Sequence, residues 1–239
     1  MTTKTLRGKR IAILAADGFE FAELALPKRA LKAAGAKVEV VSLHRGRIRG
    51  MNLTEPTRTV RVHRTLDEAR AKDYDGLFIP SGFVSPDFLR QSQAARAFVR
   101  DFDEAEKPIA TICHGPWILA SAELVSGRTM ASWPGIRDDL VHAGAIWRDA
   151  PLVSDRNWIS SRGPQDLPLF APAMVKLFAE GRTNEEPAGA VSSAKSLTPA
   201  PVAVKAARWL PGPTLRGVVA FAAVMAGGAF AMRVARSTT

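Results

Sequence analysis

Cys113 is the sole cysteine of the 239-residue sequence, and it stands where a nucleophile would be expected. The apolar run Ile109–Ile112 before it is typical of a buried strand, and a helix is predicted directly after Gly115. A residue in the turn between a strand and a helix exposes its side chain above the carboxyl end of the sheet. Because a helix N-terminus favours a thiolate, we predict a reactive Cys113 with a lowered pKa, with Gly115 making room for the turn. The alternative is a small buried hydrophobe.

Polar residues follow two other predicted strands at the same edge of the sheet. Glu20 lies shortly after the first strand, so it could meet Cys113, and a carboxyl beside a thiolate should stay protonated and donate a hydrogen bond to the sulfur. The alternative is that Glu20 merely caps the next helix. Ser81 and Gly82 follow a third strand, and we expect backbone N–H groups there to line an oxyanion pocket.

Apolar strands alternate with helical stretches along the first 180 residues. This pattern predicts an α/β fold, a three-layer sandwich with a mostly parallel, doubly wound sheet. Thr65 and Glu68 form a capping pattern that predicts a short helix. The main segments are predicted strands at 11–16, 38–43, 74–80, 109–112, 146–147 and 158–161, a strand-like piece at 59–62, and helices at 21–34, 88–106, 117–124 and 167–179.

The chain is predicted to have three parts. Residues 1–181 form the catalytic domain, 182–213 a flexible linker rich in Pro, Ala and Ser, and 214–239 an apolar C-terminal helix. Its uncharged segment 217–232 lies between Arg216 and Arg233 and is slightly shorter than a spanning helix, which needs about 20 residues. If flanking residues extend this segment to residues 215–234, it is a candidate membrane anchor. The alternative is a helix that packs on the core or on another subunit.

Composition narrows the class of protein. Apolar residues make up 46% and charged residues 23%, which argues against a disordered chain or a multi-span membrane protein. The net charge is +10, but residues 182–239 hold seven basic and two acidic residues and hence half of the excess, and no dense basic run occurs. We expect at most non-specific attraction to polyanions and no specific nucleic acid. One cysteine, no metal-finger spacing and no signal-peptide core predict a cytoplasmic protein without a metal or cofactor.

Several of these motifs together resemble the ThiJ/PfpI superfamily, and in particular its PfpI branch. The resemblance covers about residues 9–180. It rests on four motifs. They are the cysteine motif at residues 112–116, the motif at residues 17–20 followed by Glu23, Leu24 and Pro27, the segment of residues 75–82, and residues 132–145 followed by residues 155–162. It implies a flavodoxin-like sandwich of the class I glutamine amidotransferase-like group.

The resemblance also implies roles for individual residues. Cys113 is the nucleophile, His114 the neighbouring acid/base and Glu20 the carboxyl that touches the sulfur. Asp87 matches the acidic residue that orients the histidine across a subunit interface, which implies a homo-oligomer. Gly82 retains the oxyanion N–H, whereas Ser81 departs from the family's usual Gly-Gly and adds bulk.

The activity implied is that of a cysteine-dependent, stress-protective hydrolase acting on α-oxoaldehydes or their early protein adducts, as a deglycase or glutathione-independent glyoxalase. An intracellular cysteine peptidase is the first alternative, and a non-enzymatic thiol redox sensor or chaperone is the second. Glutamine amidotransfer is disfavoured, because no His-x-Glu pair follows the cysteine helix.

Overall fold

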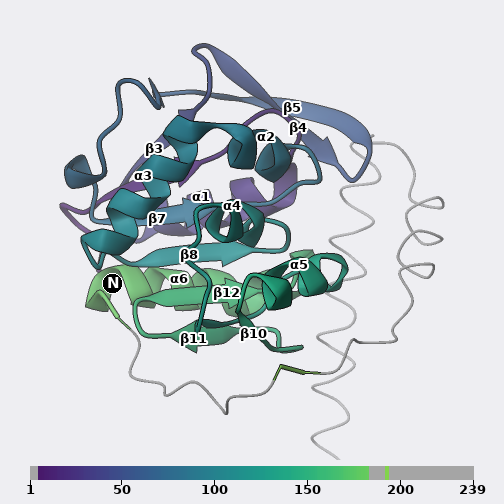
Figure 1. Ribbon diagram of the computed structural model, residues 1–239. Coiled ribbons are helices and arrows are strands. Elements are labelled where there is room, and N and C mark those ends of the chain that lie inside the picture. The colour runs from purple at the N-terminus through teal and green to yellow at the C-terminus, as the bar shows by residue number, and fades with distance from the viewer. Residues whose placement is uncertain (1–4, 183–191, 194–239) are drawn as a thin grey trace, which may run out of the picture. The chain divides into compact units, whose positions relative to one another are not determined.

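The computed structural model describes residues 5–182 and 192–193 (Figure 1). The predicted linker and apolar helix, 183–191 and 194–239, lie outside the described residues. None of the helices in the described part has the length and hydropathy of a membrane-spanning helix.

The core is a seven-stranded sheet in the order β11-β12-β8-β7-β1-β3-β6. All of its pairings are parallel except that of β11 with β12. The strands are short and almost wholly buried, as the apolar runs predict: β1 (Arg10–Leu14), β3 (Lys37–Ser42), β6 (Arg64–Thr65), β7 (Gly76–Ile79), β8 (Ile109–Ile112), β11 (Val153–Asp155) and β12 (Trp158–Ser161).

Helices cover both faces of this sheet, so the predicted three-layer α/β sandwich is confirmed. One apolar cluster joins the sheet to α2 (Ser85–Gln91), α3 (Gln93–Glu104), α4 (Pro116–Ser121) and α5 (Arg137–His142). The other cluster joins it to α1 (Phe21–Ala33) and α6 (Leu167–Glu180). In Figure 1, α3 and α4 lie in front of the sheet and α6 behind it.

Two small sheets complete the fold. β2 (Phe19–Glu20), β4 (Arg47–Asn52) and β5 (Glu55–Arg61) form a three-stranded sheet whose β4–β5 hairpin follows β3. β9 (Thr129–Met130) pairs with β10 (Ile146–Trp147). Three short 3₁₀ turns lie at η1 (Ala71–Asp73), η2 (Pro134–Ile136) and η3 (Pro164–Asp166).

Two helix predictions were wrong. The helix predicted over 88–106 is divided at Ser92, which is extended and whose hydroxyl accepts the Ala95 N–H to cap α3. The helix predicted to begin at Thr65 is absent, because Thr65 ends β6 in register with Ser42. The Glu68 carboxylate does accept the Thr65 N–H, but this capping bond closes only a turn.

The described residues beyond Gly181 contact the catalytic domain. The Ser192 hydroxyl accepts the Trp147 N–H at 3.0 Å, and the Ser193 N–H donates to the Trp147 carbonyl at 2.7 Å. The Ser193 carbonyl also accepts from the Arg137 guanidinium. A domain boundary at 181 would therefore remove contacts to β10 and α5.

Candidate active site

The carboxyl ends of the adjacent strands β1, β7 and β8 meet at one edge of the sheet, where an open α/β sheet binds its ligands. Cys113 follows β8 there with φ +58°, a left-handed conformation that a non-glycine residue adopts at a cost. Its N–H donates to the Ser161 carbonyl and its carbonyl accepts the Trp133 N–H, both at 2.9 Å. Gly115 follows, and a Cβ in its place would lie 2.5 Å from the Thr111 hydroxyl. Only glycine therefore allows the chain to turn into α4.

Glu23, rather than Glu20, lies against the nucleophile. Glu23 is fully buried in the first turn of α1, and its carboxyl lies near enough to the Cys113 thiol and the Ser81 hydroxyl for both to influence its pKa. The Glu20 carboxylate instead accepts the Leu53 N–H at 3.0 Å. The structure therefore does not bear out the contact between Glu20 and the sulfur. The reason is the phase of α1: Glu20 is its N-cap residue, whereas Glu23 shares the buried helix face.

Burial holds the Glu23 carboxyl in its neutral form. Desolvation raises its pKa to about 8, and the nearby Glu20 contributes to the rise. Neither Glu23 oxygen has a hydrogen-bond partner of good geometry among the described residues, which suits a protonated carboxyl facing a reactive centre. Since the folded pKa is raised, this residue destabilises the fold increasingly as the pH rises from 4.5 to about 8.

The Cys113 thiol is buried, and its pKa is raised, whereas the sequence predicted a lowered pKa. Cys113 is only 7% exposed. Burial raises the pKa of its thiol well above the ordinary value, and the charge of an ionised Glu23 raises it further, against the opposing contacts of the Ser81 hydroxyl and the His114 backbone N–H. The resting nucleophile is therefore a thiol that must pass its proton to a neighbour.

His114 supplies the proton acceptor. Its Nδ1 lies 3.3 Å from Cys113 Sγ. Burial lowers the pKa of the imidazole to about 4, so the ring is neutral at pH 7. Three aromatic rings surround it: Phe83 at 4.8 Å, Trp117 at 5.4 Å and Trp133 at 6.0 Å between ring centroids. A neutral, enclosed imidazole beside a thiol is suited to general base catalysis.

Ser81 and Gly82 lie at the site but do not form a vacant oxyanion pocket. The Gly82 N–H donates to the Ser81 hydroxyl, and the Gly115 N–H donates to the Ile112 carbonyl at 2.9 Å. Gly82 has φ +121°, and a Cβ there would lie 2.1 Å from the Gly18 carbonyl oxygen. This glycine therefore allows the loop to press against the segment that leads to Glu20.

Within the described part of one chain, the hydrogen-bond partner of the Asp87 side chain is Gln91 and not His114. Asp87 lies in the first turn of α2, where one of its carboxylate oxygens accepts a hydrogen bond from Gln91 Nε2 at 3.0 Å. The predicted role of Asp87 requires a second subunit. In the described part of the chain, no three His, Cys, Asp or Glu side chains are grouped as metal ligands.

The site contains residues to which the sequence motifs assigned no role. Glu23 belongs to a motif but has no predicted role, and the sequence predicts no role for the rings of Phe83, Trp117 and Trp133. A carboxyl at the buried helical spacing Glu23, Pro27 and Leu31 is the signal that could have found the first of these.

Comparison with known proteins shows the family to which the chain belongs. The family model described as DJ-1/PfpI family matches residues 9–177, and the chain belongs to this family. It is 42% identical over 169 residues to "Deglycase TK1284" of Thermococcus kodakarensis, covering 71% of this chain and 99% of the relative. It is 37% identical over 171 residues to the "Putative cysteine protease YraA" of Bacillus subtilis, covering 71% and 98%.

The fold agrees with solved structures as well. A two-domain protein from Anabaena variabilis with DJ-1/ThiJ/PfpI-like and ferritin-like domains superposes with a TM-score of 0.68 at 31% identity. The match covers 76% of this chain and 52% of that one. Membership in this family supports the expectation of a hydrolase.

Proposed function

We propose that the chain is a Cys113-dependent deglycase or glyoxalase that acts on α-oxoaldehydes or their early adducts. The observation that carries the proposal is the 3.3 Å contact between Cys113 Sγ and a neutral His114 Nδ1, with a raised-pKa carboxyl beside the sulfur. Several relatives, among them the protein of Thermococcus kodakarensis, are named deglycases, which supports the same substrate class.

The reaction on a free α-oxoaldehyde can be written with these groups. Sγ adds to the aldehyde carbon, and the thiol proton passes to His114 Nδ1, which returns a proton to the new oxygen. His114 then removes the C–H proton of the hemithioacetal and delivers it to the adjacent carbonyl carbon, while the hydroxyl proton moves to that carbonyl's oxygen. The product is a thioester, and water hydrolyses it to a 2-hydroxy acid and the free thiol. On an early adduct, the former aldehyde carbon is a hemiaminal carbon. Sγ forms its bond to this carbon as the bond to the protein amine breaks, and the amine leaves with the thiol proton, which gives the same hemithioacetal.

A peptidase is the second candidate, because one relative is named a putative cysteine protease. Two features favour a small carbonyl over a polypeptide. Cys113 is 7% and His114 5% exposed, and a half-exposed Phe83 ring packs edge-on against the imidazole. A peptide backbone would need these groups to open, whereas a small aldehyde needs a narrow approach only.

The test is a substrate panel of methylglyoxal, a methylglyoxal-treated N-acetylated amino acid and a fluorogenic peptide. We expect turnover of one or both carbonyl substrates and none of the peptide. As a matched control, protein alkylated at its sole cysteine by iodoacetamide should be inactive. Peptide hydrolysis alone would support the peptidase, and no turnover of any substrate would leave the redox-sensor alternative.

We also propose that a second copy completes the site through Asp87. Three apolar side chains beside it are exposed in the single chain: Phe83 at 47%, Val84 at 40% and Phe88 at 46%. An apolar patch that adjoins an unfinished site suits an interface between copies. A carboxylate brought to the buried His114 would orient the ring and stabilise the imidazolium that forms during the reaction.

Asp87→Ala is expected to lower kcat about tenfold or more while leaving the protein folded, because the imidazolium loses its orienting carboxylate. Asp101→Ala, which removes an exposed carboxylate from α3, is the matched control and should be neutral. Sedimentation of the wild type should show an oligomer. A fully active monomer, or full activity of Asp87→Ala in a confirmed oligomer, would contradict the proposal.

A further inference from the structure

The β4–β5 hairpin concentrates positive charge that the sequence spreads over 17 residues. Residues 45–61 contain five arginines and one acid, Glu55. Because side chains alternate across a strand, Ile48 points into the core while Arg47 and Arg49 are exposed on the opposite face. Arg61 is paired directly with Arg47 in the antiparallel register and shares that face. Arg45, Arg47, Arg49 and Arg61 are named here the arginine ribbon.

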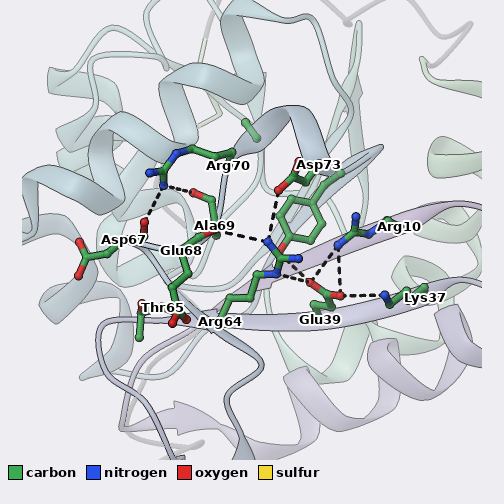
Figure 2. Close-up of polar contacts among 12 residues, drawn as sticks. Arg10, Lys37, Glu39, Arg64, Thr65, Asp67, Glu68, Ala69, Arg70 and Asp73 are labelled. Carbon is green, nitrogen blue, oxygen red and sulfur yellow. Dashed lines mark hydrogen bonds and ion pairs between the residues drawn. The ribbon is translucent and has the colours of Figure 1, made fainter.

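The ribbon places like charges together, and most of them have no acidic partner among the described residues. Like charges directly opposite on neighbouring strands repel, so the pairing of Arg47 with Arg61 costs the hairpin stability. In the described part of the chain, only Arg45 of the four has an ion-pair partner, Glu68. Arg64 offers a contrast: its guanidinium contacts both Glu39 and Asp73, within a network that also holds Arg10 and Lys37 (Figure 2).

The guanidinium groups are held in position by neutral partners. Arg47 donates to the Thr59 hydroxyl at 2.6 Å and to its carbonyl at 2.9 Å, and Arg49 donates to the Thr57 carbonyl at 2.9 Å. These bonds order the side chains across the ribbon and leave their charges unneutralised. These donors are therefore ordered before an anionic ligand binds, so binding costs little further side-chain conformational entropy.

A cavity of about 270 Å³ lies at the base of the ribbon. Its wall contains three basic residues and one acid, together with His63: Arg45, Arg61, Arg64 and Glu68, of which Glu68 pairs with Arg45. His63 Nδ1 accepts the Val40 N–H at 2.9 Å, so the proton of the neutral ring is on Nε2 and is available to a ligand. The cavity is therefore rich in donors, and a phosphate group matches both its charge and its hydrogen bonding.

We propose that the arginine ribbon and this cavity bind the phosphodiester backbone of nucleic acid without regard to base sequence. Alternate residues of a strand lie roughly 6.5–7 Å apart, which is comparable with the spacing of successive phosphates on an extended single strand. Arg47 and Arg49 stand in this relation, and the cavity next to Arg45 takes a further phosphate. Backbone binding of this kind is governed by charge and needs no base contacts.

The ribbon is joined to the catalytic loop. The Arg49 N–H donates to an Asp17 carboxylate oxygen at 2.7 Å, and the Arg49 carbonyl accepts the Gly18 N–H at 2.8 Å. At the tip of the hairpin, the Leu53 N–H donates to Glu20. A strand bound on the ribbon would therefore lie near the loop that leads to Glu23. The proposal concerns binding alone and does not depend on the reaction of Cys113.

Fluorescence anisotropy with a labelled 20-nucleotide oligothymidylate tests the proposal. The full chain should bind it at low salt, with an affinity that falls steeply as salt is raised. The triple variant R47S/R49S/R61S should lose about a hundredfold in affinity, and the slope of log K against log salt should decrease in magnitude by about 2. The matched control R7S/K72S/K176S makes the same change in net charge at exposed residues outside the ribbon and should lose less than about threefold.

A charge-conserving variant and two other ligands sharpen this test. R47K/R49K/R61K keeps the charges and should retain most of the binding, which separates loss of charge from loss of folding. A duplex of the same length should depend on the same arginines. Polyaspartate that binds as tightly as the oligonucleotide would overturn the assignment in favour of an acidic polypeptide. Equal losses in the ribbon and control variants, or no binding by the wild type at low salt, would also overturn it. Binding by a catalytically dead Cys113→Ser chain would leave the inference standing even if the proposed activity were absent.

Discussion

Cys113→Ser is expected to lower kcat/KM toward the carbonyl substrate by about a thousandfold or more while leaving the midpoint of thermal unfolding nearly unchanged. Serine has almost the shape of cysteine and can keep the backbone bonds to Ser161 and Trp133. Its hydroxyl, however, is a much weaker nucleophile than a thiol, and the adjacent neutral His114 would have to remove a far less acidic proton.

The sole cysteine makes this prediction quantitative. One equivalent of an alkylating reagent per chain should abolish activity, and the fraction of activity lost should equal the fraction of Cys113 labelled. Partial labelling with complete retention of activity would contradict a nucleophilic role. The same conclusion would follow if Cys113→Ser kept more than a tenth of the wild-type rate.

The position of Cys113 could be predicted because the features that define it are local. The apolar strand, the Cys-His-Gly-Pro turn and the following helix are contiguous, and the parallel topology follows from the alternation of strands and helices. These features require no knowledge of distant contacts, and the structure agrees with them.

The choice between Glu20 and Glu23 depended on a contact between residues about 90 positions apart. Both carboxyls follow β1, and either could be drawn beside the sulfur. The choice is made where α1 begins: with Phe21 as the first helical residue, Glu23 falls on the buried face and Glu20 remains at the cap, held by the hairpin. A shift of one residue in the helix start would move both side chains by about 100°.

Ser81 shows a second limit of prediction from motifs. The change from glycine was expected to add bulk, but the Ser81 hydroxyl also accepts the Gly82 N–H, which a glycine at this position would leave free for a ligand.

The arginine ribbon shows a third limit. A count of charge along the chain finds no dense basic run, whereas antiparallel pairing brings Arg61 beside Arg47. Pairing register and side-chain direction, which composition does not contain, create that surface.

The pH profile of kcat/KM is expected to be flat between about pH 5 and 7 and to fall on both sides. On the acid side, the rate of a site without a carboxylate partner should fall near pH 4, because burial holds the pKa of His114 at about 4 and a protonated imidazole accepts no proton. The Asp87 carboxylate of a second copy would move this limb to higher pH, because it stabilises the imidazolium. On the alkaline side, it should fall near pH 8 as the buried Glu23 ionises, since its charge beside Cys113 opposes negative charge on the sulfur.

Variants assign the two limbs of the profile. His114→Leu should lower kcat about 10²–10⁴-fold and remove the acid limb, because the Glu23 carboxyl beside the sulfur is protonated at neutral pH and cannot take the thiol proton in its place. Glu23→Gln cannot ionise, so it should remove the alkaline limb and retain much of the rate at neutral pH. These profiles can be measured by following methylglyoxal consumption in buffers of constant ionic strength. An acid limb that lies above pH 4 in the wild type and moves to lower pH in Asp87→Ala would show that the Asp87 carboxylate pairs with His114. An alkaline limb that persists in Glu23→Gln would assign it to another group.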